Sequence, residues 1–200
     1  MQSMTMCDQS ETGGDQYLWD AANKMIRGRI APHNVLLSHM VVRSPFKDEI
    51  RTVLEIGSGS GQFSYFMHEY KHKVTLIDAS TKAIELGKAS FKGNEDDVDF
   101  IVGDILNCQL KETFDLVYSG GLLEHYSGEE LRQMFLAHIR ASDRFVLIAV
   151  PSDVPRNWSR AIRNNDKSST EGALPNWKPI SEAQLIDLFE ENGLEPVMLS

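Results

Sequence analysis

The chain has 200 residues, which is the size of one ordinary domain and enough to bury a substantial core. It carries 20 basic and 29 acidic residues, and this net charge of −9 argues against general affinity for nucleic acid or for an anionic membrane, because both attract excess positive charge. No apolar stretch approaches the length needed to cross a bilayer, and the polar N-terminus does not resemble a secretory signal.

The N-terminal region precedes the repeating part of the chain. Residues 1–15 are small and polar, which predicts a flexible tail. Residues 16–45 contain two predicted helical stretches, and the second has Leu36, Leu37, Met40 and Val41 at helical spacing after Pro32. Proline is tolerated in a first helical turn, so we expect the second helix to begin there and the pair to form a helical cap on the domain.

Between residues 46 and 150, short apolar runs alternate with amphipathic ones. Strands are predicted at 52–56, 74–78, 98–102, 114–119 and 144–150, because each run is rich in β-branched or aromatic residues. Helices are predicted at 62–70, 81–91 and 128–141, with Ser80 as an N-cap and Ser127 with Glu130 as a capping box. This alternation is typical of a doubly wound α/β domain, in which helices cover both faces of a mostly parallel sheet.

The last part of the chain first breaks the alternation and then resumes it. Residues 151–180 hold four of the seven prolines and two of the three tryptophans, which predicts an insert on the substrate side. Ser181 and Gln184 form a second predicted capping box, before a helix that ends near Asn192 and Gly193. Residues 194–200 are predicted as a sixth strand, so residues 16–200 are expected to form a single domain with its core at 46–150 and its last helix and strand at 181–200.

A glycine-rich loop, LEIGSGSGQF at residues 54–63, follows the first predicted strand. Ligands of doubly wound sheets bind at the carboxyl ends of the strands, where glycines let the backbone approach closely. A P-loop would need Lys followed by Ser or Thr, and the dinucleotide motif GxGxxG would need a third glycine at the position of Gln62. Glu55 would repel a pyrophosphate, but it suits a ligand that carries positive charge.

Two more carboxylates follow neighbouring predicted strands. Asp78 ends the second strand, where an acidic side chain binds ribose hydroxyls, and Asp104 follows the third strand at the same edge of the sheet. A purine, a ribose and a cation without a required phosphate describe S-adenosylmethionine. The alternatives are local: Asp78 would cap helix 81–91, and Asp104 would cap a short turn.

Five segments in order now resemble the motifs of the class I S-adenosylmethionine-dependent methyltransferases: VLEIGSGSGQF, VTLIDAS, VDFIVGDIL, FDLVYSGGLLEHYS and RFVLIAVPSD. The resemblance covers residues 50–150 and is greatest to the small-molecule branch. It implies the Rossmann-like methyltransferase fold, the strand order 3-2-1-4-5-6 and S-adenosylmethionine as cofactor. The family's seventh strand, inserted between the fifth and sixth, has no visible counterpart here, which puts the completeness of the sheet edge in question.

The resemblance also implies which residues bind the cofactor. The methionine end is expected at Glu55, Gly57, Ser58 and Gly59, with Gly61 shaping the loop. The adenosine end is expected at Asp78, Ala79, Asp104 and Ile105, and the methyl group near Ser119 and Gly120.

His125 and Glu124 follow the fourth predicted strand, near the expected methyl group, and are the candidate catalytic residues. Methyl transfer depends on positioning, and a hydroxyl acceptor often also needs a base, for which histidine is suited near neutral pH. The alternative is a structural pair in which the imidazole bonds to the backbone.

The acceptor side is expected to involve the N-terminal cap and the insert, with candidates Tyr17, Trp19, His33, Arg156, Trp158 and Arg160. Tyr17 and Trp19 would form a lid or simply dock on the domain. Arg156 and Arg160 belong to a basic stripe at helical spacing, which would grip an anionic acceptor or face solvent. Trp158 would line the acceptor pocket or close the insert's own small core.

No metal-ligand cluster appears in the sequence, and the two cysteines, Cys7 and Cys108, have neither CxxC nor zinc-site spacing. We therefore expect no metal and a reduced, cytoplasmic protein. The predicted function is methyl transfer from S-adenosylmethionine to oxygen or nitrogen of a small molecule. A protein or nucleic-acid methyltransferase and a catalytically silent cofactor-binding partner remain the alternatives.

Overall fold

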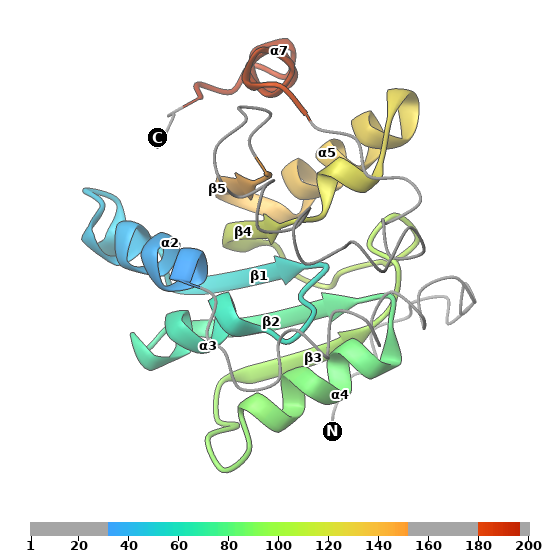
Figure 1. The fold of residues 1–200 in the computed structure, drawn as a ribbon. Coiled ribbons are helices and arrows are strands. Elements are labelled where there is room, and N and C mark those ends of the chain that lie inside the picture. Colours follow the sequence, from blue (N-terminus) through green and yellow to red (C-terminus); the bar gives the residue numbers. More distant parts are fainter. Residues whose placement is uncertain (1–31, 152–179, 197–200) are drawn as a thin grey trace, which may run out of the picture.

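The computed structural model describes residues 32–151 and 180–196 (Figure 1). The predicted tail, the first N-terminal helical stretch, nearly all of the insert and the end of the predicted sixth strand lie outside the described residues. So do five of the candidate acceptor-side residues: Tyr17, Trp19, Arg156, Trp158 and Arg160.

A five-stranded parallel sheet forms the centre of the protein, with strand order β3-β2-β1-β4-β5. The strands are β1 Thr52–Ile56, β2 Lys73–Asp78, β3 Val98–Val102, β4 Phe114–Gly120 and β5 Ser142–Ala149. The predicted doubly wound α/β fold is confirmed, as are the first five places in the predicted strand order. The order reverses between β1 and β4, which is where ligands bind in sheets of this kind.

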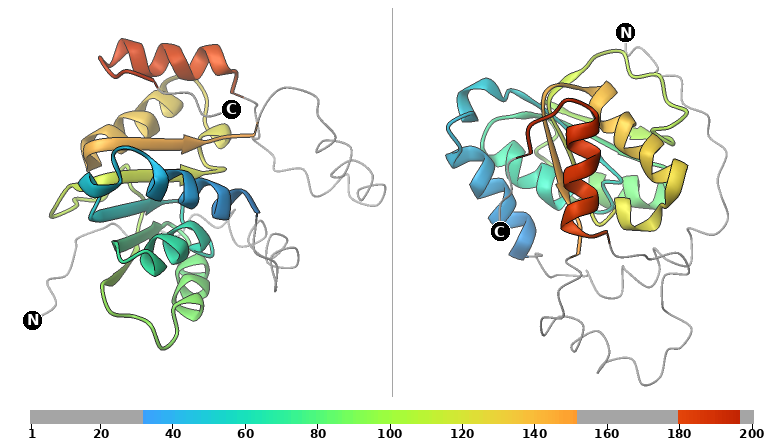
Figure 2. Two further views of the ribbon diagram at one scale, coloured as in Figure 1. Left: turned by 90° about the vertical axis from the view of Figure 1, so that its left-hand side faces the viewer. Right: turned by 90° about the horizontal axis from the view of Figure 1, so that it is seen from above.

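Helices cover both faces of the sheet (Figures 1 and 2). One apolar cluster joins β1, β2 and β4 to the helices on one face, and a second joins the sheet to the helices on the other. The first face carries α2 Pro32–Arg43, α3 Gln62–Glu69 and α4 Thr81–Ser90, and the second carries α5 Gly128–Ala141 and α7 Glu182–Glu191. Short 3-10 helices lie at η1 Lys47–Glu49 and η2 Leu123–His125. No helix in the described ranges is long and apolar enough to cross a membrane.

Two of the three predicted helix starts with a capping side chain are confirmed. The Ser80 hydroxyl accepts a hydrogen bond from the Ala83 N–H at 3.3 Å, and Ser181 forms the predicted capping box with Gln184. The capping box predicted at Ser127 is wrong, because the Ser127 side chain makes no capping hydrogen bond. Gly128, directly after it, has a φ of +57°, and this left-handed turn directs the chain into α5 without the usual cap geometry.

Residues 103–113 cross from β3 to β4 as turns and extended chain, without a helix. Cys108 lies in this connection and is disulfide-bonded. The expectation of reduced cysteines is therefore wrong for Cys108. Spacing along the sequence does not determine which sulfur atoms a fold brings together.

Candidate functional site

The glycine loop leaves β1 through backbone conformations that only glycine adopts readily. Gly57, Gly59 and Gly61 have φ angles of +64°, +54° and +67°. A Cβ on Gly57 would lie 2.8 Å from Cδ1 of Leu122, and a Cβ on Gly61 would collide with Cδ2 of Leu76. The loop is thus packed tightly on both sides, by the segment after β4 and by β2.

Asp78, at the end of β2, fixes the loop. Its Oδ2 accepts a hydrogen bond from the Gly59 N–H at 2.9 Å, and its Oδ1 accepts one from the Ser80 N–H at 2.8 Å. The side-chain cap of α4 comes from Ser80 and not from Asp78, while Ala79 between them is exposed. Each carboxylate oxygen can accept more than one hydrogen bond, so Asp78 keeps capacity for a ligand.

Glu55 is a buried carboxyl beside this loop, only 6% exposed. Its Oε2 accepts a hydrogen bond from the Ser64 N–H in the first turn of α3 at 3.0 Å. Burial raises the pKa of Glu55 from its ordinary value of 4.5 to about 7, and the charge of Asp78 adds to the rise. None of the ion pairs within the described ranges involves Glu55, so its charge is left for a cation from outside them.

Tyr118 lies opposite Glu55 in the β1–β4 register and was not predicted as a site residue. Its ring stacks on Phe63 with 3.8 Å between centroids, and its hydroxyl donates to Oδ1 of Asn34 in α2 at 3.2 Å. Burial, followed by the charges of Glu55 and Glu124, raises the pKa of Tyr118 above its ordinary value. The neutral hydroxyl therefore links α2 to the carboxyl ends of β1 and β4. No spacing in the sequence marked the contact of Tyr118 with Asn34, which lies 84 residues away along the chain.

Ser119 points to the other face of the sheet, where it is completely buried. Its hydroxyl lies 2.8 Å from Nε2 of His138, and Nδ1 of His138 lies 2.8 Å from the Met134 carbonyl oxygen. Since a carbonyl can only accept, Nδ1 carries the proton and Nε2 accepts the Ser119 O–H. Burial lowers the pKa of His138 to about 4, which keeps the ring neutral. Of the two predicted methyl-side residues, only Gly120 is exposed at the edge.

Glu124 is a third buried carboxyl of the site, after Glu55 and Asp78; it is 3% exposed, and its Oε2 has no hydrogen-bond partner. Burial raises its pKa above the ordinary value. A Cβ on Gly121 would stand 3.4 Å from Oε1, so Gly121 covers the carboxyl with backbone alone. His125, its neighbour in η2, is half-buried, and its backbone N–H donates to the Leu122 carbonyl oxygen at 3.1 Å.

The other predicted site residues within the described ranges are Asp104, Ile105, Ser58 and His33. Asp104 caps its own turn, because Oδ1 accepts from the Leu106 N–H at 3.0 Å and Oδ2 from the Asn107 side chain at 2.9 Å. Ile105 is buried in the apolar cluster beneath α5, and Ser58 is buried in the loop with an unpartnered hydroxyl. His33 is exposed at the start of α2.

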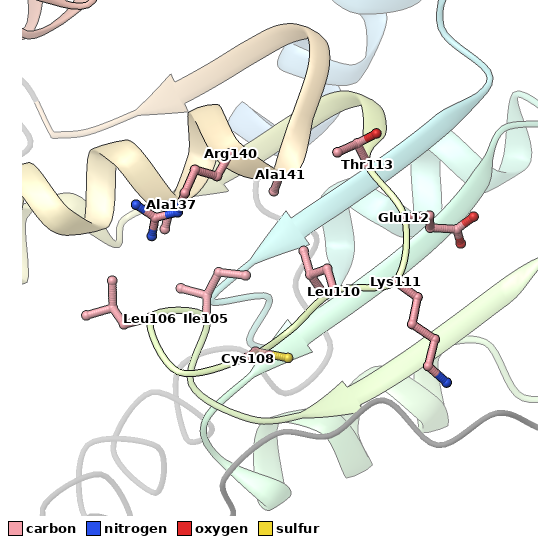
Figure 3. Close-up of a pocket in the computed structure, with 10 residues that line it drawn as sticks. All are labelled: Ile105, Leu106, Cys108, Leu110, Lys111, Glu112, Thr113, Ala137, Arg140 and Ala141. Atoms are coloured by element: carbon pink, nitrogen blue, oxygen red, sulfur yellow. The ribbon is translucent and has the colours of Figure 1, made fainter.

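A cavity of about 390 Å³ lies elsewhere, between the 103–113 connection and the end of α5 (Figure 3). Its lining shares only Ile105 with the predicted cofactor site. The cavity is therefore separate from the glycine loop, Glu55 and Glu124.

Comparisons with known proteins agree with this geometry. Residues 53–142 match the family described as "Methyltransferase domain". The chain is 33% identical over 84 residues to the malonyl-[acyl-carrier protein] O-methyltransferase of Priestia megaterium (strain DSM 319 / IMG 1521). The aligned segment covers 41% of this chain and 30% of that relative. The chain thus spans less than a third of the length of this relative.

Solved structures share the fold. The magnesium protoporphyrin IX methyltransferase of Synechocystis PCC 6803, solved with bound SAH, superposes with a TM-score of 0.65 at 18% identity, covering 90% of this chain and 86% of that one. An O-methyltransferase family protein from Burkholderia thailandensis gives a TM-score of 0.68 at 14% identity, covering 94% of this chain and 58% of that one.

Proposed function

We propose that this chain is an S-adenosylmethionine-dependent methyltransferase that transfers a methyl group to oxygen or nitrogen of a small molecule. The match of residues 53–142 to the methyltransferase domain family and the shared fold support the proposal. The names of similar proteins support a small acceptor: one acts on magnesium protoporphyrin IX and another on an amino pentose. A third acts on malonyl-[acyl-carrier protein], which keeps an acceptor carried by a protein as the alternative.

The observation that carries the proposal is the buried, unpaired Glu55 beside the glycine loop. It is 6% exposed, has a raised pKa and takes part in no ion pair within the described ranges. Glu55 accepts a hydrogen bond from Ser64 but has no opposite charge beside it in the described ranges. A buried carboxylate without a counter-charge is costly, and a cationic ligand removes that cost. The loop beside it presents backbone without Cβ atoms, which a ligand can approach closely.

We assign the cofactor contacts to the residues that meet at this edge. Glu55 receives the ammonium group, with Gly57, Ser58 and Gly59 around the methionine portion, and Asp78 accepts hydrogen bonds from the ribose hydroxyls. Ala79, Asp104 and Ile105 surround the adenine, and Gly61 holds the loop in shape. Ser119 contributes its backbone beside Gly120, because its hydroxyl is bonded to His138. The bound cofactor supplies an electrophilic methyl group on a sulfonium.

The acceptor must be held in line with that methyl group and must lose a proton. We assign the role of accepting this proton to His125, which is half-buried in η2, after the end of β4. His33 at the start of α2 is proposed on the acceptor side. Tyr17, Trp19, Arg156, Trp158 and Arg160 remain proposals for the same side, and the arginines would suit an anionic acceptor.

Two measurements test the proposal. Mass spectrometry of a metabolite extract incubated with the protein and S-adenosylmethionine should reveal a species that gains one methyl group. Calorimetry should show that Gly59→Asp abolishes cofactor binding, because bulk and negative charge enter the cradle. Gly93→Asp is the matched control, since Gly93 also has a positive φ but lies in the loop before β3 with nothing within 4 Å of an added Cβ. Binding without any methylated product would favour a catalytically silent cofactor-binding protein, and equal affinity in folded Gly59→Asp would reject the site.

A further inference from the structure

We propose that Glu124 is a cofactor-binding residue that faces the sulfonium, and that it makes the site prefer S-adenosylmethionine to its uncharged product, S-adenosylhomocysteine. The inference rests on the proposed function, because it concerns the same site. It adds a residue and a discrimination that the glycine loop alone does not provide.

The first observation is the state of the carboxyl itself. Glu124 is 3% exposed, and its Oε2 is buried without a hydrogen-bond partner. It belongs to none of the ion pairs in the described part of the chain. Buried polar atoms are rarely left unsatisfied, and one at the edge of a binding site points to a ligand group that completes it. A nearby positive charge is the group that most stabilises the ionised form of such a buried carboxyl.

The second observation is where the carboxyl lies. The segment that carries Glu124 packs against the glycine loop, since Leu122 occupies the space that a Cβ on Gly57 would need. The Tyr118 hydroxyl lies beside Gly120, and its pKa responds to the charges of both Glu55 and Glu124. Glu55 at the end of β1 and Glu124 in η2 after β4 therefore both lie near Tyr118, at the edge of the sheet that the glycine loop occupies.

The third observation is the match of charges. S-adenosylmethionine carries two positive groups, an ammonium and a sulfonium separated by three carbons. With Glu55 assigned to the ammonium and Asp78 to the ribose, Glu124 is the third buried carboxyl of the described residues at this edge, and we assign it to the sulfonium. After transfer the sulfur is neutral while the ammonium is unchanged. Only the interaction with Glu124 is then lost, and this weakens binding of the product relative to the cofactor.

The experiment compares three ligands by calorimetry on the wild type and on Glu124→Gln, which keeps the shape and removes the charge. S-adenosylmethionine should bind about tenfold more weakly to the variant, a modest value for a charge pair near a protein surface. S-adenosylhomocysteine should change by less than about twofold. Sinefungin, which carries an amine in place of the sulfonium, should weaken like S-adenosylmethionine. Glu130→Gln, at an exposed glutamate in the first turn of α5, is the control and should change none of the three.

The outcomes separate the two proposals. Wild-type protein that binds none of the ligands would reject the proposed function together with this inference. Equal changes for S-adenosylmethionine and S-adenosylhomocysteine in Glu124→Gln, or no change in either, would reject the inference alone. If Glu124→Gln does not fold, Glu124→Asp decides, because it keeps the carboxylate but withdraws it by one methylene: S-adenosylmethionine should weaken more than S-adenosylhomocysteine. Equal changes for the two ligands in Glu124→Asp would overturn the role of Glu124.

Discussion

Glu55 should destabilise the cofactor-free protein, and Glu55→Gln should therefore stabilise it above neutral pH. A carboxyl whose pKa is raised by folding holds its proton more tightly in the folded state than in the unfolded chain. The pKa of Glu55 is 4.5 as its ordinary value, which we take for the unfolded chain, and about 7 in the folded protein. The free energy of unfolding is therefore little affected below pH 4.5 and falls as the pH rises from 4.5 to about 7. At about 1.4 kcal/mol for each pH unit, the loss is roughly 3 kcal/mol and is complete above pH 7.

Urea unfolding of the cofactor-free protein at pH 5 and pH 8 measures this effect. The difference in unfolding free energy between Glu55→Gln and the wild type should grow by about 2.5 kcal/mol between the two pH values. Groups that do not interact with Glu55 titrate alike in both proteins, so their contributions cancel in the difference. Glu85→Gln, an exposed glutamate on α4, is the control and should show no such growth. A difference independent of pH would refute the argument that burial raises this pKa. The stabilised variant should also lose affinity for S-adenosylmethionine, because the group that costs stability is the one assigned to the ammonium.

Two more predictions concern catalysis and the loop. His125→Ala should lower turnover by about a hundredfold or more and leave cofactor affinity within about twofold, as expected for a general base; full turnover would remove His125 from the mechanism. Gly61→Ala should destabilise the protein by about 2–4 kcal/mol, for two reasons. The alanine backbone would have to keep the left-handed φ of Gly61, and its methyl group would collide with the buried side chain of Leu76. Gly93→Ala, with a φ of +84° and nothing within 4 Å, is the matched control for backbone strain. Equal losses of unfolding free energy in the two variants would show that packing against Leu76 contributes nothing.

The strands were predictable because their signal is local. The runs at 52–56 and 98–102 match the bounds of β1 and β3, and β5 begins two residues before its predicted start. Apolar side chains mark the buried middle of a strand, whereas hydrogen bonds to the neighbouring strand decide its ends. The places of the glycine loop, Glu55 and Asp78 in the fold were predictable for the same reason, since each lies within a few residues of a strand end.

The missed residues depend on contacts between distant segments. Tyr118 reaches Asn34 in α2, and His138 reaches Ser119 from α5. Neither pair has a spacing that marks it in the sequence. The disulfide at Cys108 is a third case, because the chain's cysteine spacing indicated no bond.

The end of β4 shows what motif transfer and strand geometry each contribute to the site. The motif places Ser119 beside the methyl group without specifying which of its atoms is there. Alternation along the strand sends Tyr118 and Ser119 to opposite faces, and the partners agree: Tyr118 stacks on Phe63 of α3, and Ser119 bonds to His138 of α5. The Ser119 hydroxyl is therefore committed to the interior, and β4 offers a ligand its backbone and the exposed Gly120. Of β4 and the segment after it, we therefore assign the side chains that act on the methyl group to Glu124 and His125, and not to Ser119.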